Sequence, residues 1–185
     1  MPVTTGPLTA QRILVYGVTG SGKSTAAGRI AARTGLPLTL ADELTWLPGW
    51  VPVAEDRQRE LFGEVVAGDR WVLDTAYGAW LDVVLPRVEL VVALDYPRWF
   101  SLQRLVRRTL RRALDQKPVC NGNTESLRNL CSRDSIVSWH FRSFDRKRSR
   151  MRQWAEAPEG PPVLVCRRPK DLERWMDQLG ARCHD

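Results

Sequence analysis

The chain has 185 residues, of which 43% are hydrophobic and 26% charged, a composition typical of one globular domain with its own core. It contains no run approaching the roughly 20 apolar residues that a membrane span needs. Residues 1–11 lack the basic and apolar regions of a signal peptide, so we expect a cytoplasmic protein. The net charge of +7 favours anionic partners, either nucleotides or nucleic acid.

The first half of the chain alternates short apolar runs with helical patterns. The run at Ile13 to Val15 is typical of a buried strand, and an alanine-rich helix after it is ended by Gly35 and Pro37. The predicted elements are strands over 12–16, 38–40 and 71–73, helices over 23–34 and 54–67, and a Trp/Pro/Gly loop at 46–50.

The second half continues this alternation and contains most of the arginines. Its predicted elements are a strand over 90–94, a basic helix over 98–114, a loop over 115–124, a second basic helix over 134–154, a strand over 163–166 and a helix over 169–179. Short strands that are apolar on both faces, alternating with helices, indicate an α/β fold whose parallel sheet is covered on both sides. We expect a single domain over 1–185, with an insertion over the sheet edge from Asp115 to about Arg133.

Between the first strand and the first helix, Gly17 to Ser24 matches the P-loop pattern G-x-x-x-x-G-K-S/T. Its glycines let backbone N–H groups turn inward and cradle phosphate oxygens, and the helix N-terminus adds its positive dipole. We therefore predict that the chain binds ATP with Mg²⁺. The residues expected to bind the nucleotide are Gly17, Gly20, Ser21, Gly22, Lys23, Ser24 and Thr25.

Within this motif the side chains have separate expected roles. Lys23 is expected to contact the β- and γ-phosphates, and the Ser24 hydroxyl is expected to ligate Mg²⁺. Thr25 is the expected contact for the α-phosphate.

P-loop proteins also place a carboxylate near the metal, and two strands end in one. Asp74 follows Trp71 to Leu73, and Asp95 follows Leu90 to Leu94. Either would hold Mg²⁺ through water, although Asp95 has the alternative of capping the helix that begins at Arg98. We favour Asp74 for the metal.

The second strand ends near Asp42, at the carboxyl edge where open sheets bind ligands. Asp42 is a candidate to orient an acceptor hydroxyl or the metal, and its alternative role is a helix cap or a surface acid. Trp46 and Trp50 are candidates to stack on a base, with plain packing as the alternative.

The arginines of the second half have three interpretations. They stabilise charge on a transferring phosphoryl group, bind nucleic acid, or lie on solvated helix faces. Arg107, Arg108, Arg111 and Arg112 recur at i, i+4 spacing and form a basic stripe along one helix face.

The order of these motifs resembles the P-loop kinases of the nucleoside-monophosphate kinase group. The resemblance is greatest to the small bacterial adenylate kinase-related branch labelled "DNA topology modulation protein" (FlaR-like). It spans most of the chain, and is carried by Gly17 to Thr25, Asp42 to Trp50, Trp71 to Tyr77, Leu94 to Arg112, Gly122 to Glu125 and Arg133 to Ile136.

The resemblance implies a three-layer P-loop fold with a five-stranded parallel sheet and a helical lid over about 115–144. In such a kinase Arg104 and Arg108 would face the nucleotide phosphates. Arg133 and Arg142 would close from the lid on the γ-phosphate, and Arg168 would lie beside the adenine.

One segment departs from the family pattern. Adenylate kinases follow the third-strand Asp with Gly-Phe-Pro-Arg, and the related branch has Asp-Gly-Asn-Tyr, whereas here Asp74 precedes Thr75-Ala76-Tyr77. The segment therefore does not identify the acceptor.

The sequence favours an ATP-dependent kinase acting on a small nucleotide-like or other hydroxylated acceptor, with catalytic roles for Lys23, Asp42, Arg133 and Arg142. The alternatives are a nucleic-acid-binding regulatory P-loop ATPase and a nucleotide-binding module without turnover. A GTPase is disfavoured because the Asn-Lys-x-Asp signature is missing from the sequence.

Overall fold

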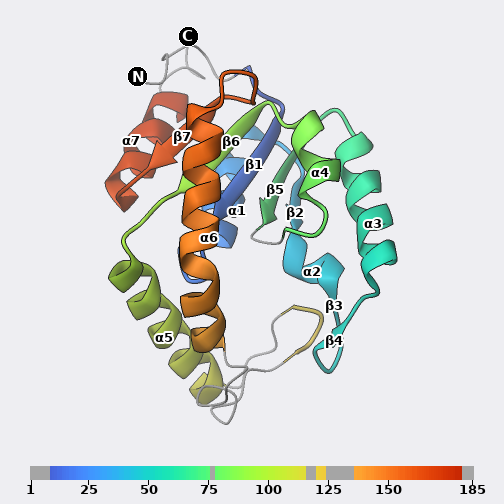
Figure 1. Ribbon diagram of the computed structural model, residues 1–185, viewed down its shortest axis with the longest axis vertical. Coiled ribbons are helices and arrows are strands. Elements are labelled where there is room, and N and C mark those ends of the chain that lie inside the picture. Colours follow the sequence, from blue (N-terminus) through green and yellow to red (C-terminus); the bar gives the residue numbers. More distant parts are fainter. Residues whose placement is uncertain (1–8, 76–77, 116–119, 124–135, 181–185) are drawn as a thin grey trace.

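The structure, a computed structural model, describes residues 9–75, 78–115, 120–123 and 136–180. Its centre is a five-stranded parallel sheet with the strand order β2-β5-β1-β6-β7 (Figure 1). The strands are β1 (Arg12–Gly17), β2 (Leu38–Leu40), β5 (Trp71–Thr75), β6 (Leu90–Leu94) and β7 (Val163–Cys166). The five-stranded α/β architecture predicted from the sequence is confirmed.

Strand β1 lies in the middle of this sheet, between β5 and β6. Leu14 pairs with Leu73 on one side and with Val91 on the other. All five residues of β6 are buried, as expected for a strand covered on both faces. This register brings the end of β1, where the P-loop begins, next to the ends of β5 and β6.

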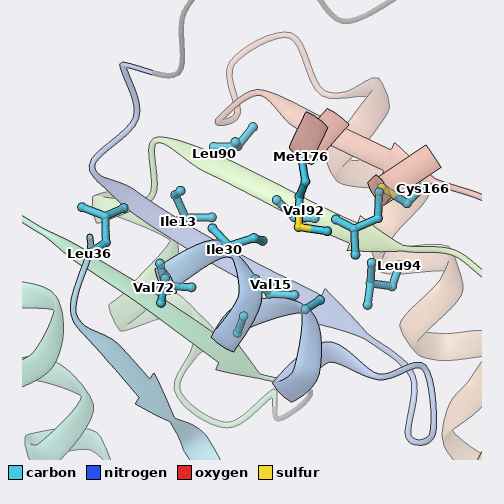
Figure 2. Packing of buried hydrophobic residues seen from close by; sticks show 14 of the residues in the cluster. Ile13, Val15, Ile30, Leu36, Val72, Leu90, Val92, Leu94, Cys166 and Met176 are labelled. Carbon is cyan, nitrogen blue, oxygen red and sulfur yellow. The ribbon is translucent and has the colours of Figure 1, made fainter. Parts of the chain in front are cut away.

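Helices cover both faces of the sheet. One face is packed against α1 (Lys23–Thr34) and α7 (Pro169–Gly180), and Figure 2 shows Ile30 and Met176 meeting the strand side chains there. The other face is packed against α3 (Glu55–Ala67), α4 (Leu81–Val84) and α6 (Ile136–Glu156). Helix α5 (Arg98–Asp115) lies beside α6 below the sheet (Figure 1).

Five short elements, among them α4, were not predicted. Helix α2 (Ala41–Thr45) follows β2 directly, and η1 (Leu85–Arg87) follows α4. The predicted loop at 46–50 is in fact the turn of an antiparallel hairpin, β3 (Trp46–Leu47) and β4 (Val51–Pro52). Gly49 and Trp50, both with positive φ, close that turn. Helices of three to five residues make little more than one turn, which is too short to show a helical period, and two-residue strands are too short to show alternation.

The second basic helix is α6, which runs unbroken over 21 residues and crosses the sheet face (Figure 1). Its lower part overlaps the predicted lid over 115–144. The rest of that lid lies largely outside the described residues, apart from the end of α5 and the segment 120–123.

Candidate functional site

The P-loop connects β1 to α1 through two glycines in the left-handed conformation. Gly20 and Gly22 have φ values of 81° and 89°, in the left-handed region that favours glycine. A Cβ atom built on Gly22 would lie 2.6 Å from Nη2 of Arg104, so the Arg104 guanidinium lies directly over the loop. A positive side chain and the N-terminus of α1 therefore face the same loop.

Two helices hold the P-loop from outside it. A Cβ atom on Gly20 would lie 2.8 Å from Cβ of Leu105, so the loop packs directly against α5. From α6, Nδ1 of the buried His140 lies 3.0 Å from the carbonyl oxygen of Thr19. Burial lowers the pKa of His140, and a carbonyl only accepts hydrogen bonds, so the neutral ring donates from Nδ1–H.

The pair expected to serve the metal is brought together at the end of β5. The Ser24 hydroxyl donates to Oδ2 of Asp74 at 2.5 Å, and the Ala41 amide donates to Oδ1 at 2.8 Å. Asp74 is only 3% exposed. Hydroxyl and carboxylate oxygens are the ligands that Mg²⁺ prefers, and the Ser21 hydroxyl in the same loop is buried without a partner in the described part of the chain. The residues present therefore fit a magnesium–nucleotide site.

The rival carboxylate, Asp95, is engaged elsewhere. Its Oδ1 accepts a 2.7 Å hydrogen bond from Nε of Arg148, and Arg152 lies 3.7 Å from Oδ2. Both arginines belong to α6. The ion pair therefore attaches α6 to the end of β6, which is a structural role for Asp95.

A small cleft of about 60 Å³ opens beside the P-loop, between α1, α5 and α7. Tyr96 and Leu172 provide apolar walls, and Arg104 lines the phosphate side. Arg168 lies just before α7, where its backbone amide is bonded to Asp171 and its side chain is exposed. Arg108, one turn beyond Arg104 on α5, is half-buried. The lining of the cleft therefore combines apolar side chains with a positive side chain next to the P-loop.

Asp42 does not end strand β2 as predicted but lies exposed on the short helix α2. Beyond it, the β3–β4 hairpin is fastened to the segment 120–123. The Asn123 amide accepts from the Trp50 N–H at 2.8 Å and donates to the Leu47 carbonyl at 3.0 Å. Trp46 and Trp50 meet edge to face at 5.9 Å, so packing explains their contact with each other.

Of the two predicted lid arginines, Arg133 lies outside the described residues. Arg142 lies on α6, two residues beyond His140, with an exposed side chain. Other basic residues form ion pairs, for example Arg98 with Asp145 and Arg29 with Glu173. These pairs account for part of the surplus positive charge without nucleic acid.

Sequence reasoning missed two basic residues of α6, Lys147 and Arg150, which are turned toward the ends of the strands. Lys147 is 3% exposed, and burial together with the nearby charge of Lys23 lowers its pKa to about 7. Arg150 donates from Nη1 to the Tyr16 hydroxyl at 3.3 Å. In sequence both belong to an arginine-rich helix, and no local signal separates them from its solvated residues.

The described residues contain neither a helix that could cross a membrane nor a cluster of metal ligands. No helix in that part of the chain combines the length and apolarity needed to cross a bilayer. Nor does that part contain a cluster of three or more His, Cys, Asp or Glu side chains suited to a metal ion.

Comparison of the sequence with protein-family models and with curated proteins gives no match. Solved structures give matches over almost the whole chain. A gluconokinase from Sinorhizobium meliloti is 16% identical, with a TM-score of 0.51 and coverage of 94% of this chain and 95% of that one. A shikimate kinase from Bacteroides thetaiotaomicron is 15% identical, with a TM-score of 0.54 and coverage of 96% and 100%. A shikimate kinase from Acinetobacter baumannii, in complex with shikimate, is 18% identical, with a TM-score of 0.51 and coverage of 95% and 94%. The chain therefore has the fold of the P-loop kinases.

Proposed function

We propose that this protein is an ATP-dependent kinase that transfers the γ-phosphoryl group to a small-molecule acceptor. The observation that carries the proposal is the contact between Ser24 and Asp74 at the base of a P-loop with the required glycine geometry. A phosphate cradle and a pair of oxygen ligands at one sheet edge are what phosphoryl transfer from MgATP needs. The assignment to the adenylate kinase-related branch stays a prediction.

On the donor side, each residue has a defined task. The loop amides and Lys23 bind the β- and γ-phosphates, and Thr25 contacts the α-phosphate. Ser24 and Asp74 would hold Mg²⁺, which neutralises charge on the phosphates when it is bound. Arg104 neutralises further phosphate charge, with Arg108 beside it, and Arg168 borders the base. Catalysis by these groups is positioning and electrostatic stabilisation.

The acceptor binds at the same edge of the sheet, near Asp42 and the β3–β4 hairpin. The names of the structural neighbours, gluconokinase and shikimate kinase, support a small hydroxylated acceptor. Asp42 would orient the hydroxyl that attacks the γ-phosphorus, because a carboxylate accepts the hydroxyl proton in a hydrogen bond.

A lid over about 115–144 completes the proposal. Arg133 and Arg142 would close from it on the transferring group, and closure would exclude water and so limit wasteful hydrolysis. The hydrogen bonds from Asn121 to the carbonyls of Glu43 and Trp46, at 2.9 and 2.7 Å, tie one part of this segment to the acceptor side. Acceptor binding and lid position would then be linked.

The test is a coupled assay of ADP release with MgATP against a panel of hydroxylated metabolites, nucleosides and nucleoside monophosphates. We expect release that depends on one class of acceptor. Release at the same rate with every panel member, or stimulation only by DNA or RNA, would contradict the proposal and favour a regulatory ATPase.

A further inference from the structure

The inner face of α6 contains two cations, one turn apart, that structural ion pairing does not explain. Lys147 is only 3% exposed, and its ammonium forms no ion pair with a carboxylate among the described residues. Its closest aromatic contact is the Trp139 ring, whose centroid lies 5.7 Å from Nζ. Arg150 has the Tyr16 hydroxyl as its hydrogen-bond acceptor, and no carboxylate of the described chain lies within ion-pair distance of it.

Arg148, on the same helix, differs from Lys147 and Arg150 because its charge has a structural role. Arg148 is paired with the buried Asp95 at 2.7 Å and fixes α6 to the sheet. A buried cation without such a partner costs free energy, and proteins tolerate it chiefly where function requires it. Consistent with that cost, burial lowers the pKa of Lys147 to about 7.

The surroundings of Lys147 place it inside the proposed catalytic site. The charged groups that act on it are Lys23 of α1, Asp42 of α2, and Arg146 and Arg150 of its own helix. Lys147 therefore lies near enough to Lys23 and to Asp42 for the charges of both to act on it.

Arg150 extends the same positive surface away from the donor cleft. Its Nη1 lies 3.3 Å from the Tyr16 hydroxyl and 3.1 Å from the position that a Cβ atom on Gly78 would occupy. Tyr16 belongs to the core on the α3, α4 and α6 face of the sheet, whereas the nucleotide cleft is lined by α1, α5 and α7. Arg150 thus lies on the face of the sheet opposite the cleft beside the P-loop.

We propose that Lys147 and Arg150 bind an anionic group of the acceptor, so that the substrate is a small hydroxylated molecule bearing a carboxylate or a phosphate. The inference rests on the proposed kinase function and names its substrate class. An ammonium and a guanidinium can share one anion because the guanidinium offers two parallel donors and the ammonium a third. Binding would add a second negative charge near Lys147, besides that of Asp42.

The test is anion binding measured by calorimetry on protein saturated with Mg²⁺ and a non-hydrolysable ATP analogue. The analogue fills the donor site through its γ-phosphate, so a further anion must bind elsewhere. Orthophosphate and gluconate are the anionic probes, and glucose is the neutral match for gluconate. We expect at least one anion to bind, glucose to bind more weakly, and Lys147→Met and Arg150→Met each to weaken the anion about 10-fold or more.

Arg152→Met is the matched control, because it removes one positive charge from the same helix on the side of Asp95. It should leave anion binding within about twofold. Gluconate binding alone assigns a carboxylate and orthophosphate binding alone assigns a phosphate, and either outcome supports the inference. Failure of both anions to bind, or equal affinities in wild type, Lys147→Met and Arg150→Met, would overturn it.

This experiment separates the inference from the proposed function because it needs no turnover. Anion binding that depends on Lys147 in a protein that transfers no phosphoryl group would contradict only the kinase assignment. Efficient phosphorylation of a neutral acceptor, unchanged in Lys147→Met, would overturn only the acceptor class.

Discussion

The P-loop and the inner face of α6 meet in one site, but the sequence encodes them in different ways. The P-loop is contiguous, and eight residues from Gly17 to Ser24 define both its shape and its chemistry. The functional face of α6 is assembled from His140, Lys147 and Arg150, whose roles come from the elements they touch. A local motif therefore predicts the nucleotide donor, and only tertiary structure points to a candidate acceptor site.

The largest expected effect comes from a substitution in the P-loop, the region defined by a local motif. Lys23→Ala removes the cation that faces the β- and γ-phosphates, and we expect turnover to fall on the order of 10³-fold, as for other cations at the transferring group. The measurement is acceptor-dependent ADP release, with circular dichroism to establish folding. Lys170→Ala, an exposed residue of α7, is the control. Wild-type turnover by folded Lys23→Ala protein would contradict the assignment of Lys23 to the phosphates of ATP.

Asp74 and Asp95, the two carboxylates at strand ends, test the difference between the two regions. Asp74 contacts the P-loop, whereas Asp95 is paired with an arginine of α6. Asp74→Asn weakens a group next to the metal, and we expect about a 10- to 100-fold loss of activity with a raised Mg²⁺ requirement. Asp95→Asn should instead lower the free energy of unfolding by about 1–3 kcal/mol, because Arg148 loses a charged acceptor.

A Mg²⁺ titration of turnover and a urea unfolding curve on both variants test this division. A raised Mg²⁺ requirement for Asp95→Asn, with none for Asp74→Asn, would reverse the roles given to these residues.

An effect of intermediate size is expected on the pH dependence of folding stability, through the protonation of Lys147. Its pKa is about 7 in the folded chain and 10.5 in the reference state, so the unfolded chain binds more protons between these values. Stability therefore rises with pH through this window, and the buried charge destabilises the protein most at pH 7 and below. Lys147→Met should raise the Tm by several degrees near pH 6.5, and the gain should shrink toward pH 10.5.

Thermal unfolding of both proteins across this pH range is the measurement. A Tm gain that stays constant from pH 6.5 to 10.5 would contradict a low pKa for Lys147. A gain in stability accompanied by weaker anion binding would mark a residue retained for function rather than for folding.

The smallest expected effect concerns the link between the two regions. His140→Ala removes the hydrogen bond from α6 to Thr19, and a single neutral hydrogen bond corresponds to about a 3- to 10-fold loss of nucleotide affinity. His140→Asn keeps a side-chain donor and should recover part of that loss. Equal affinities for wild type and His140→Ala would mean that α6 does not position the P-loop.

Much of this molecule could be predicted from its sequence. Strands β2, β6 and β7 and helix α1 have the predicted bounds, because apolar runs and the Gly35 cap are local signals. Ser24 and Asp74 were both expected near one metal ion, and the structure places them in contact, while their metal role stays a prediction.

The parts of the fold and of the site that the sequence did not predict depend on contacts between residues that are distant in sequence. The hairpin at Trp46 to Pro52 is fastened by two hydrogen bonds with Asn123, which lies more than seventy residues away in sequence. The burial of Lys147 depends on how α6 crosses the sheet, and a periodic basic helix gives no indication of which of its cations will be enclosed. The roles of Arg133 and Arg142 stay predictions.

The most direct test of the central claim is the fate of the γ-phosphoryl group. ATP labelled at the γ-position would be incubated with the protein and the acceptor panel, and the label would be followed into product and into orthophosphate. We predict transfer to one anionic hydroxylated acceptor, with little label released to water. Label that appears only as orthophosphate, at a rate raised by DNA or RNA, would contradict the kinase assignment.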